Sequence, residues 1–228
     1  RIPHGQIVVS GQLIGDNAFG GFRSGRKHGA LGDGPDAVHE IRHSVVAAVA
    51  DHGEVSLGSH GGHTARIARR IWETIIAEGH KADLMGIVEA DREGVDWNKY
   101  DTVIIGCAVI YGKMNRELVA FVNRFKAVLD AKATSFFSVS LIARAEAKCT
   151  PEGNLYTRKF LENNPWKPKD AHCFAGKVDY PNWGWLDTKA IQMIMKMTKG
   201  PTDPTAIIDY TNWDDVPEYA RHCLTLEA

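Results

Sequence analysis

The sequence lacks the features that mark a disulfide scaffold, a zinc ribbon or a membrane-spanning protein. No CxxC pair is present, and the four cysteines are widely spaced, at Cys107, Cys149, Cys173 and Cys223. This spacing indicates neither a metal ribbon nor a dithiol centre, and it fits reduced thiols in a cytosolic setting. No run of about eighteen uncharged apolar residues occurs, so we expect no membrane-spanning helix. The N-terminus also lacks the layout of a signal peptide.

Motifs for nucleoside triphosphates, dinucleotides and nucleic acids are missing as well. The sequence holds neither the G-x-x-x-x-G-K-[ST] loop nor the G-x-G-x-x-G turn. Residues 39–43 (HEIRH) do match H-E-x-x-H, in which two histidines one helical turn apart bind zinc. Arg42 places a charge inside this motif and nothing else resembles a protease. We therefore expect no metal site, and bound zinc would be needed to revive a zinc peptidase.

Charge is unevenly distributed along an almost neutral chain. The 228 residues are 44% hydrophobic and 24% charged with a net charge of -1, which is ordinary for a globular protein. Residues 113–199 hold fifteen Lys and Arg and eight Asp and Glu, a net charge of about +7. Such a surface attracts an anionic substrate or an anionic membrane face. The alternative is a solvated basic face without a partner.

Composition divides the chain near residue 54. The first 53 residues hold ten of the 22 glycines and five of the ten histidines. We expect residues 1–53 to form an N-terminal extension, disordered in part, with one helix over residues 37–50. Residues 54–228 are expected to form the folded domain.

Strand and helix patterns alternate regularly from residue 54 onward. Apolar runs predict strands at 55–58, 81–88, 102–109, 134–142 and 171–178. Periodic apolar residues predict helices at 63–78, 116–130, 186–197 and 214–226. This alternation predicts a doubly wound α/β fold with five parallel strands, as in flavodoxin-like proteins. A ligand is then expected in the crevice at the carboxyl ends of the strands.

A glycine-containing turn follows the first predicted strand. It reads Ser59, His60, Gly61, Gly62, His63 and Thr64, and then a helix begins. Small residues let backbone N–H groups approach a phosphate, hydroxyls donate further hydrogen bonds, and the helix N-terminus adds positive potential. The turn therefore predicts a phosphate site. The alternative is an ordinary strand-to-helix turn with a serine cap.

Two further loops are candidates for the flavin ring of a flavodoxin-like protein. The third strand ends in Ala108, Val109, Ile110, Tyr111 and Gly112, and the fourth contains Ser138, Val139, Ser140 and Leu141. We expect Tyr111 to stack on the ring and Gly112 to allow a close approach. Backbone groups after the fourth strand are expected to meet the polar edge of the flavin. The alternative for Tyr111 is a side chain that covers the sheet edge.

Five segments make the chain resemble one particular family. They are YDTVIIGCAVIYGK (100–113), FFSVSLIARAEAKCTPEGNLYTRKFL (136–161), FAGKVDYPNWGWLD (174–187), IMKMTKGPTD (194–203) and YTNWDDV (210–216). With the turn at 54–68, they resemble the menaquinone-dependent protoporphyrinogen oxidases over residues 54–226. The long insertion after the fourth strand, residues 143–168, is the most specific part of the resemblance.

The resemblance implies an enzyme of heme biosynthesis that works with FMN. Such an enzyme oxidises protoporphyrinogen IX to protoporphyrin IX in three two-electron steps and reduces menaquinone or ubiquinone. It implies a peripheral place on the cytoplasmic face of the inner membrane. No catalytic side chain follows from the resemblance, because the flavin N5 is the expected hydride acceptor. The quinone and any homo-oligomeric state stay open.

Basic and aromatic residues in the second half give weaker predictions. Arg144, Lys148, Arg158 and Lys159 lie in the insertion, and we expect some of them to bind substrate propionates; the alternative is solvated side chains. Tyr180, Trp183 and Trp185 are candidates for a membrane interface, or for a lid over a core edge.

The start of the chain departs from the family. Fifty-three residues precede the expected first strand, and Ser56 and Gly58 are weak residues for a central strand. The leader is either a genuine extension or the product of an altered reading frame or start. Two other functions remain as alternatives: an electron-transfer flavodoxin and an NAD(P)H-quinone reductase.

Overall fold

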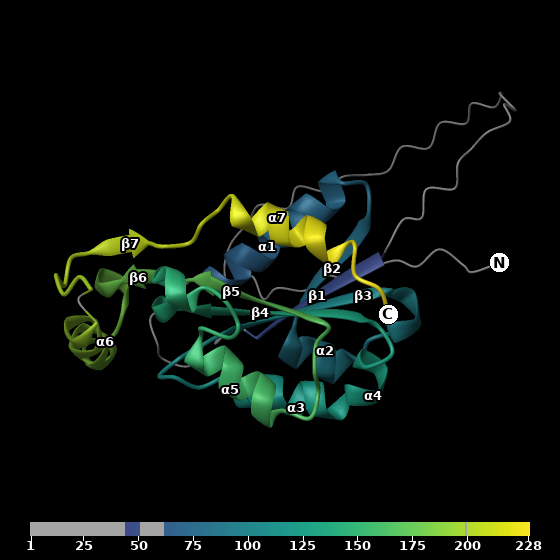
Figure 1. The fold of residues 1–228 in the computed structure, drawn as a ribbon, viewed down its shortest axis with the longest axis horizontal. Helices are drawn as coiled ribbons and strands as arrows, with labels where there is room; N and C mark the ends of the chain where they lie inside the picture. The colour runs from purple at the N-terminus through teal and green to yellow at the C-terminus, as the bar shows by residue number, and fades with distance from the viewer. Residues whose placement is uncertain (1–43, 51–61, 199) are drawn as a thin grey trace, which may run out of the picture.

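Five parallel strands form the centre of the protein. The computed structural model describes residues 44–50, 62–198 and 200–228. The strands are β1 (Ser44–Ala50), β2 (Lys81–Gly86), β3 (Thr102–Ala108), β4 (Ala133–Ser140) and β5 (Asp170–Ala175). Their order in the sheet is β2-β1-β3-β4-β5 (Figure 1). The chain thus winds outward from β1 in both directions, which is the flavodoxin-like arrangement.

Strand β1, an interior strand of the sheet, lies where the sequence predicted a helix. Residues 44–50 pair in parallel with β2 on one side and with β3 on the other. The predicted helix over 37–50 is therefore wrong for these residues. The alanines favour a helix, but three valines favour extended backbone, and two flanking strands supply the hydrogen bonds. The sheet also begins before the predicted domain boundary at residue 54, and the strand predicted at 55–58 lies outside the described residues.

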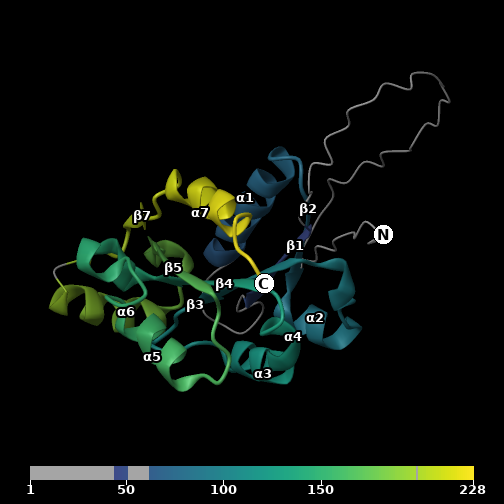
Figure 2. The same cartoon turned by 45° about the vertical axis from the view of Figure 1, so that its right-hand side comes forward.

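Helices cover both faces of the sheet. On one face lie α1 (His63–Ala77) and α7 (Asp215–Cys223), whose Ile67, Ile71 and Tyr219 join one buried cluster (Figure 2). The other face carries α2 (Ile87–Glu93), α3 (Arg116–Arg124), α4 (Lys126–Leu129) and α5 (Leu155–Asn163). Both faces of β3 and β4 are consequently buried, which explains the almost wholly apolar sequence of β3.

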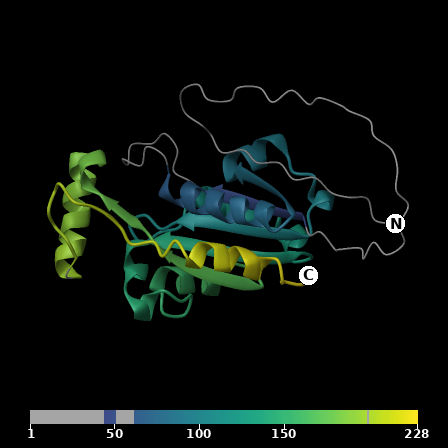
Figure 3. The ribbon, with the colours of Figure 1, turned by 90° about the horizontal axis from the view of Figure 1, so that it is seen from above.

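The chain between β4 and β5 and the chain after β5 carry the remaining elements. Two 3-10 turns, η2 (Leu141–Arg144) and η3 (Glu146–Lys148), precede α5, and η4 (Tyr180–Asn182) follows β5. A further 3-10 turn, η1 (Trp97–Lys99), lies earlier in the chain, between α2 and β3. After β5, the antiparallel pair β6 (Lys177–Asp179) and β7 (Ile207–Asp209) packs against α6 (Trp185–Met197). Figure 3 shows α6 beyond the end of the main sheet.

Several predicted elements are divided in the structure. The strand predicted at 171–178 breaks at Gly176, where β5 leaves the main sheet and β6 begins a second one. The helix predicted at 116–130 divides at Phe125, and the last residues of the strand predicted at 81–88 belong to α2. Across the described ranges, no helix has both the length and the apolar character needed to cross a bilayer.

Candidate functional site

The carboxyl edge of the sheet brings three predicted segments to one side of the molecule. Strands β1, β3 and β4 are adjacent and parallel, so the chain that follows each of them emerges at the same edge. The sheet order reverses at β1, and crevices at such a reversal bind ligands in open α/β sheets. Ser59, His60 and Gly61 of the predicted phosphate turn lie outside the described residues, whereas Gly62, His63 and Thr64 begin α1.

The N-terminus of α1 suits a phosphate group. Gly62 caps the helix without a side-chain hydrogen bond, and the first turn holds no acidic residue. The backbone N–H groups at such an end carry partial positive charge, and a phosphate is stabilised there. Thr64 is buried under this turn.

His63 links this turn to the far end of the chain. Its Nε2 lies 2.6 Å from Oγ1 of Thr211 and 3.5 Å from a carboxylate oxygen of Asp209. The Thr211 hydroxyl donates its proton to the carbonyl of Ala175, so the Nε2–H of His63 must be the donor to Thr211. Nδ1 of His63 then faces no hydrogen-bond partner although it is buried. Burial lowers the pKa of His63, more than the carboxylate of Asp209 raises it.

A tight turn holds the aromatic candidate at the end of β3. Ile110 and Lys113 exchange two backbone hydrogen bonds, and both residues between them have positive φ, 49° at Tyr111 and 74° at Gly112. This is the backbone of a type I′ turn, and a non-glycine residue with positive φ is uncommon. The Tyr111 side chain is 48% exposed at the sheet edge. The predicted stacking of Tyr111 on a flavin ring stays a prediction.

The turn at 110–113 also touches the insertion helix. A Cβ placed on Gly112 would lie 2.9 Å from Cε1 of Tyr156, which belongs to α5. Ala108, Val109 and Ile110 are half-buried, and the Val109 N–H donates to the carbonyl of Val139. The three elements β3, β4 and α5 thus fix the turn.

The hydroxyl groups at the end of β4 are used within the protein. Ser138 lies 2.7 Å from Oγ1 of Thr157, and Ser140 accepts a hydrogen bond of 3.1 Å from the amide of Asn154. Asn154 caps α5, so these serines anchor the insertion to the sheet. The Ser140 carbonyl accepts from Gly176. Backbone contact between this segment and a flavin stays a prediction.

The four basic residues of the insertion have different surroundings. Arg144 donates to the carbonyl of Leu141 at 2.8 Å and to Oγ1 of Thr198 at 2.8 Å, so its guanidinium ties η2 to the end of α6. Arg158 donates to the carbonyl of Glu152 at 2.9 Å. Lys148 and Lys159 are exposed, and their ammonium groups make neither a hydrogen bond nor an ion pair with any described residue.

The aromatic residues after β5 also differ in their surroundings, since some are buried and one is exposed. Tyr180 is buried, donates to the carbonyl of Pro201 and packs edge-on against Trp183. These two residues cover a core edge, while Trp185 at the start of α6 is 71% exposed.

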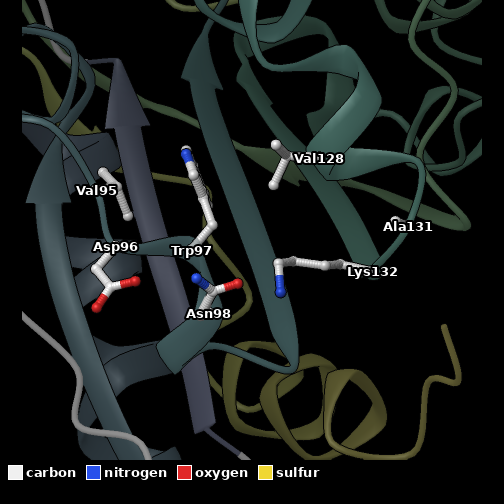
Figure 4. Close-up of a pocket in the computed structure, with 7 residues that line it drawn as sticks. All are labelled: Val95, Asp96, Trp97, Asn98, Val128, Ala131 and Lys132. Carbon is white, nitrogen blue, oxygen red and sulfur yellow. The ribbon is translucent and has the colours of Figure 1, made fainter.

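A surface hollow lies at the opposite edge of the sheet. It is formed where the chain enters β3 and β4, by Val95, Asp96, Trp97, Asn98, Val128, Ala131 and Lys132 (Figure 4). Because the amino ends of parallel strands face away from their carboxyl ends, this hollow is separate from the candidate flavin site.

The strand order, with helices on both faces of the sheet, defines a flavodoxin-like α/β protein. Residues 55–205 match the flavodoxin domain family. The chain belongs to this family, and a flavin is its cofactor. Thr211 and Asp209, which hold His63, were not identified from sequence, because no spacing connects them to the phosphate turn.

Two curated proteins that share one name are similar in sequence to this chain. The chain is 34% identical over 167 residues to the protoporphyrinogen IX dehydrogenase [quinone] of Escherichia coli K12, a match that covers 73% of this chain and 91% of the relative. It is 40% identical over 121 residues to the protein of the same name from Leishmania major, covering 53% and 52%. The printed name of both relatives describes a quinone-linked protoporphyrinogen IX dehydrogenase, in agreement with the resemblance found from the sequence motifs.

Solved structures align with the chain at low identity. An NADH:FMN oxidoreductase (EMOB) in its apo form aligns with a TM-score of 0.47 at 12% identity, covering 82% of this chain and 91% of that one. A flavodoxin from the Archaea aligns with a TM-score of 0.40 at 12% identity, covering 78% and 99%. The family assignment rests on the sequence matches.

Proposed function

We propose that this protein oxidises protoporphyrinogen IX to protoporphyrin IX, with FMN as its cofactor and menaquinone or ubiquinone as electron acceptor. The similarity to the Escherichia coli dehydrogenase, over 91% of that relative, carries the proposal. The reaction belongs to heme biosynthesis. It makes the protein an oxidoreductase.

FMN fits the described residues better than a flavin without a phosphate. The uncapped N-terminus of α1 accepts a phosphate group, and the buried Nδ1 of His63 beside it lacks a partner. Tyr111, exposed on its turn, covers the flat ring. Bound FMN supplies two-electron redox chemistry. The chain binds the cofactor, orients it and limits access of water to it.

The basic residues of the insertion select the substrate. Protoporphyrinogen carries propionate groups, and the ammonium groups of Lys148 and Lys159 are exposed with no ion pair to a described residue. Arg158 is partly engaged and Arg144 is committed to Leu141 and Thr198. We assign the propionate contacts to the two lysines first.

The acceptor determines where the protein works. Menaquinone and ubiquinone have long apolar tails and dissolve in bilayers, so the protein meets them at the cytoplasmic face of the inner membrane. Peripheral attachment, which the family resemblance implies, is part of this proposal.

An anaerobic fluorescence assay tests the function. Purified protein is mixed with FMN, protoporphyrinogen and a soluble menaquinone analogue, and porphyrin fluorescence is followed. We expect porphyrin fluorescence to increase only when both FMN and the quinone are present. FMN binding without porphyrin formation would support an electron-transfer flavodoxin, and NADH- or NADPH-driven quinone reduction would support the reductase alternative.

A further inference from the structure

Helix α6 presents an apolar face that no described residue covers. Trp185 and Leu186 are each 71% exposed, Met193 is 65% exposed and Ile194 is 38% exposed. The opposite side of the helix is anchored, because Met195 is fully buried and Ile191 packs with it against Val178. The exposed side chains are therefore held on a fixed surface, and they are not the result of a loose helix.

The exposed residues form one amphipathic stripe with two lysines. At about 100° per residue, Leu186, Met193 and Ile194 fall within about one third of the helix circumference. Lys189 and Lys196 lie beside this apolar arc, between Met193 and Trp185. Both lysines are exposed and make no ion pair with a described side chain. Elsewhere, large exposed apolar residues such as Val88 and Ile76 lie on separate helices. A contiguous apolar patch on a folded protein marks an interaction site.

We propose that the exposed face of α6 is the surface by which this protein docks on an anionic lipid bilayer. Trp185, Leu186 and Met193 enter the interface between headgroups and acyl chains, and Lys189 and Lys196 reach lipid phosphates. Tryptophan is favoured at that depth because its ring is both apolar and polar. The exposed apolar side chains suit the acyl region of a bilayer, and the two lysines beside them suit its anionic headgroups.

The charge of α6 favours an anionic bilayer over a second copy of the chain as the partner of its exposed face. The α6 sequence holds Lys189 and Lys196 against one acid, Asp187. In the neighbouring β6–β7 pair, Asp179 forms an ion pair with Lys177 and Asp209 forms one with Arg66. Two copies meeting through this face would bring their lysines together, which opposes self-association.

The position of α6 connects docking to the candidate flavin site. The β6–α6–β7 unit begins directly after the carboxyl end of β5 (Figure 1). Arg144, which follows β4, donates a hydrogen bond to Thr198 at the end of α6. Docking through α6 therefore holds the carboxyl edge of the sheet, with Tyr111, close to the bilayer. The benefit of this placement rests on the proposed function, because it is the quinone acceptor that dissolves in lipid.

Vesicle binding of the whole FMN-loaded protein tests the surface. Co-sedimentation is measured with vesicles of phosphatidylglycerol and phosphatidylcholine, and with phosphatidylcholine alone. Leu186→Ser with Met193→Ser removes the apolar contacts, and Lys189→Gln with Lys196→Gln removes the charge. The matched controls are Val88→Ser with Ile76→Ser and Arg69→Gln with Lys81→Gln, which change exposed residues on other elements.

We expect wild-type protein and both controls to bind anionic vesicles. Each α6 pair should weaken that binding at least about tenfold, and the lysine pair should act on anionic vesicles alone. Brominated lipid should quench fluorescence in wild-type protein and much less in Trp185→Phe. Turnover with a soluble quinone analogue should be unchanged in every variant.

Several outcomes would overturn the docking surface while leaving the proposed function intact. They are no vesicle binding by active wild-type protein, equal binding by the α6 variants, and a dimer that the apolar pair converts to a monomer in sedimentation velocity. Vesicle binding through α6 without porphyrin formation would support the docking surface and remove the proposed function.

Discussion

The imidazole of His63 donates a hydrogen bond of 2.6 Å to the hydroxyl of Thr211, although 148 residues separate the two in the chain. The contact ties the first turn of α1 to the segment that follows β7. Thr211 in turn is held by the carbonyl of Ala175 at the end of β5. The candidate phosphate site is thus held in place by a contact between the first helix and the segment that follows β7.

Replacing Thr211 should weaken both the fold and the cofactor site. Thr211→Val leaves the Ala175 carbonyl without its donor and frees the His63 ring, at a cost of about 1–2 kcal/mol in unfolding free energy. We also expect lower FMN affinity, measured by quenching of flavin fluorescence. Thr202→Val, at an exposed position, is the control. Unchanged FMN affinity in Thr211→Val would show that the hydrogen bond between His63 and Thr211 does not contribute to cofactor binding.

A pair of glycine substitutions separates backbone strain from a role in binding. Gly112 has a φ of 74° and Gly79 a φ of 87°, so alanine at either position should cost about 1 kcal/mol. A Cβ meets Tyr156 at Gly112 but nothing within 4 Å at Gly79. Gly112→Ala should therefore lower FMN affinity, and Gly79→Ala should not. Equal affinities in the two variants would argue against a flavin beside the 110–113 turn.

Asp83 should make the protein less stable at neutral pH than it would be with a neutral side chain. Burial raises the pKa of this carboxyl from 3.8 to about 6, despite the hydrogen bond from Tyr100. The folded state then holds the proton more tightly than the unfolded state, so stability falls as pH rises between these values. Asp83→Asn should gain about 2 kcal/mol at pH 7 and nothing below about pH 4.

Urea unfolding at several pH values checks this expectation. Asp91→Asn is the matched control, because Asp91 forms an exposed ion pair with Arg124 and such pairs contribute little. A gain at pH 7 that persists at low pH would point to packing and away from the charge of Asp83.

The insertion lysines should affect substrate binding more than turnover. Lys148→Ala with Lys159→Ala should raise KM for protoporphyrinogen severalfold with little change in kcat, since exposed charge attracts propionates before the reaction. Raised ionic strength should reduce the difference between variant and wild type. Arg144→Ala should instead lower thermal stability and loosen α6 in hydrogen exchange. A KM equal to that of wild type in the lysine variant would leave these lysines as solvated residues.

The sequence predicted the regular parts of the fold because their periodicity is strong. Apolar runs located β3 and β4, and the spacing of Ile67, Ile71 and Ile75 located α1. Pairing between distant segments was harder to predict. The break at Gly176 depends on β7, which lies far along the chain, and the strand at 44–50 depends on partners on both sides.

The candidate site was predictable in outline and not in its details. A glycine-containing turn and a Tyr-Gly pair after an apolar strand are visible as local patterns. The engagement of Ser138 with Thr157, of Ser140 with Asn154 and of Arg144 with Thr198 is not, because each contact joins residues from different elements. Polar residues that looked available for a ligand are therefore partly used to build the insertion.

The position of β1 shows that the sheet begins earlier in the chain than the region that matches the flavodoxin domain. Similarity to the flavodoxin domain begins at residue 55, yet the strand between β2 and β3 is residues 44–50. Within the main sheet, β2 pairs with β1 alone. A fragment trimmed to the matching region would split the sheet, because β2 would have no neighbour and β3 would become an edge. The region that matches the flavodoxin domain therefore lacks a strand that the hydrogen-bonded sheet requires.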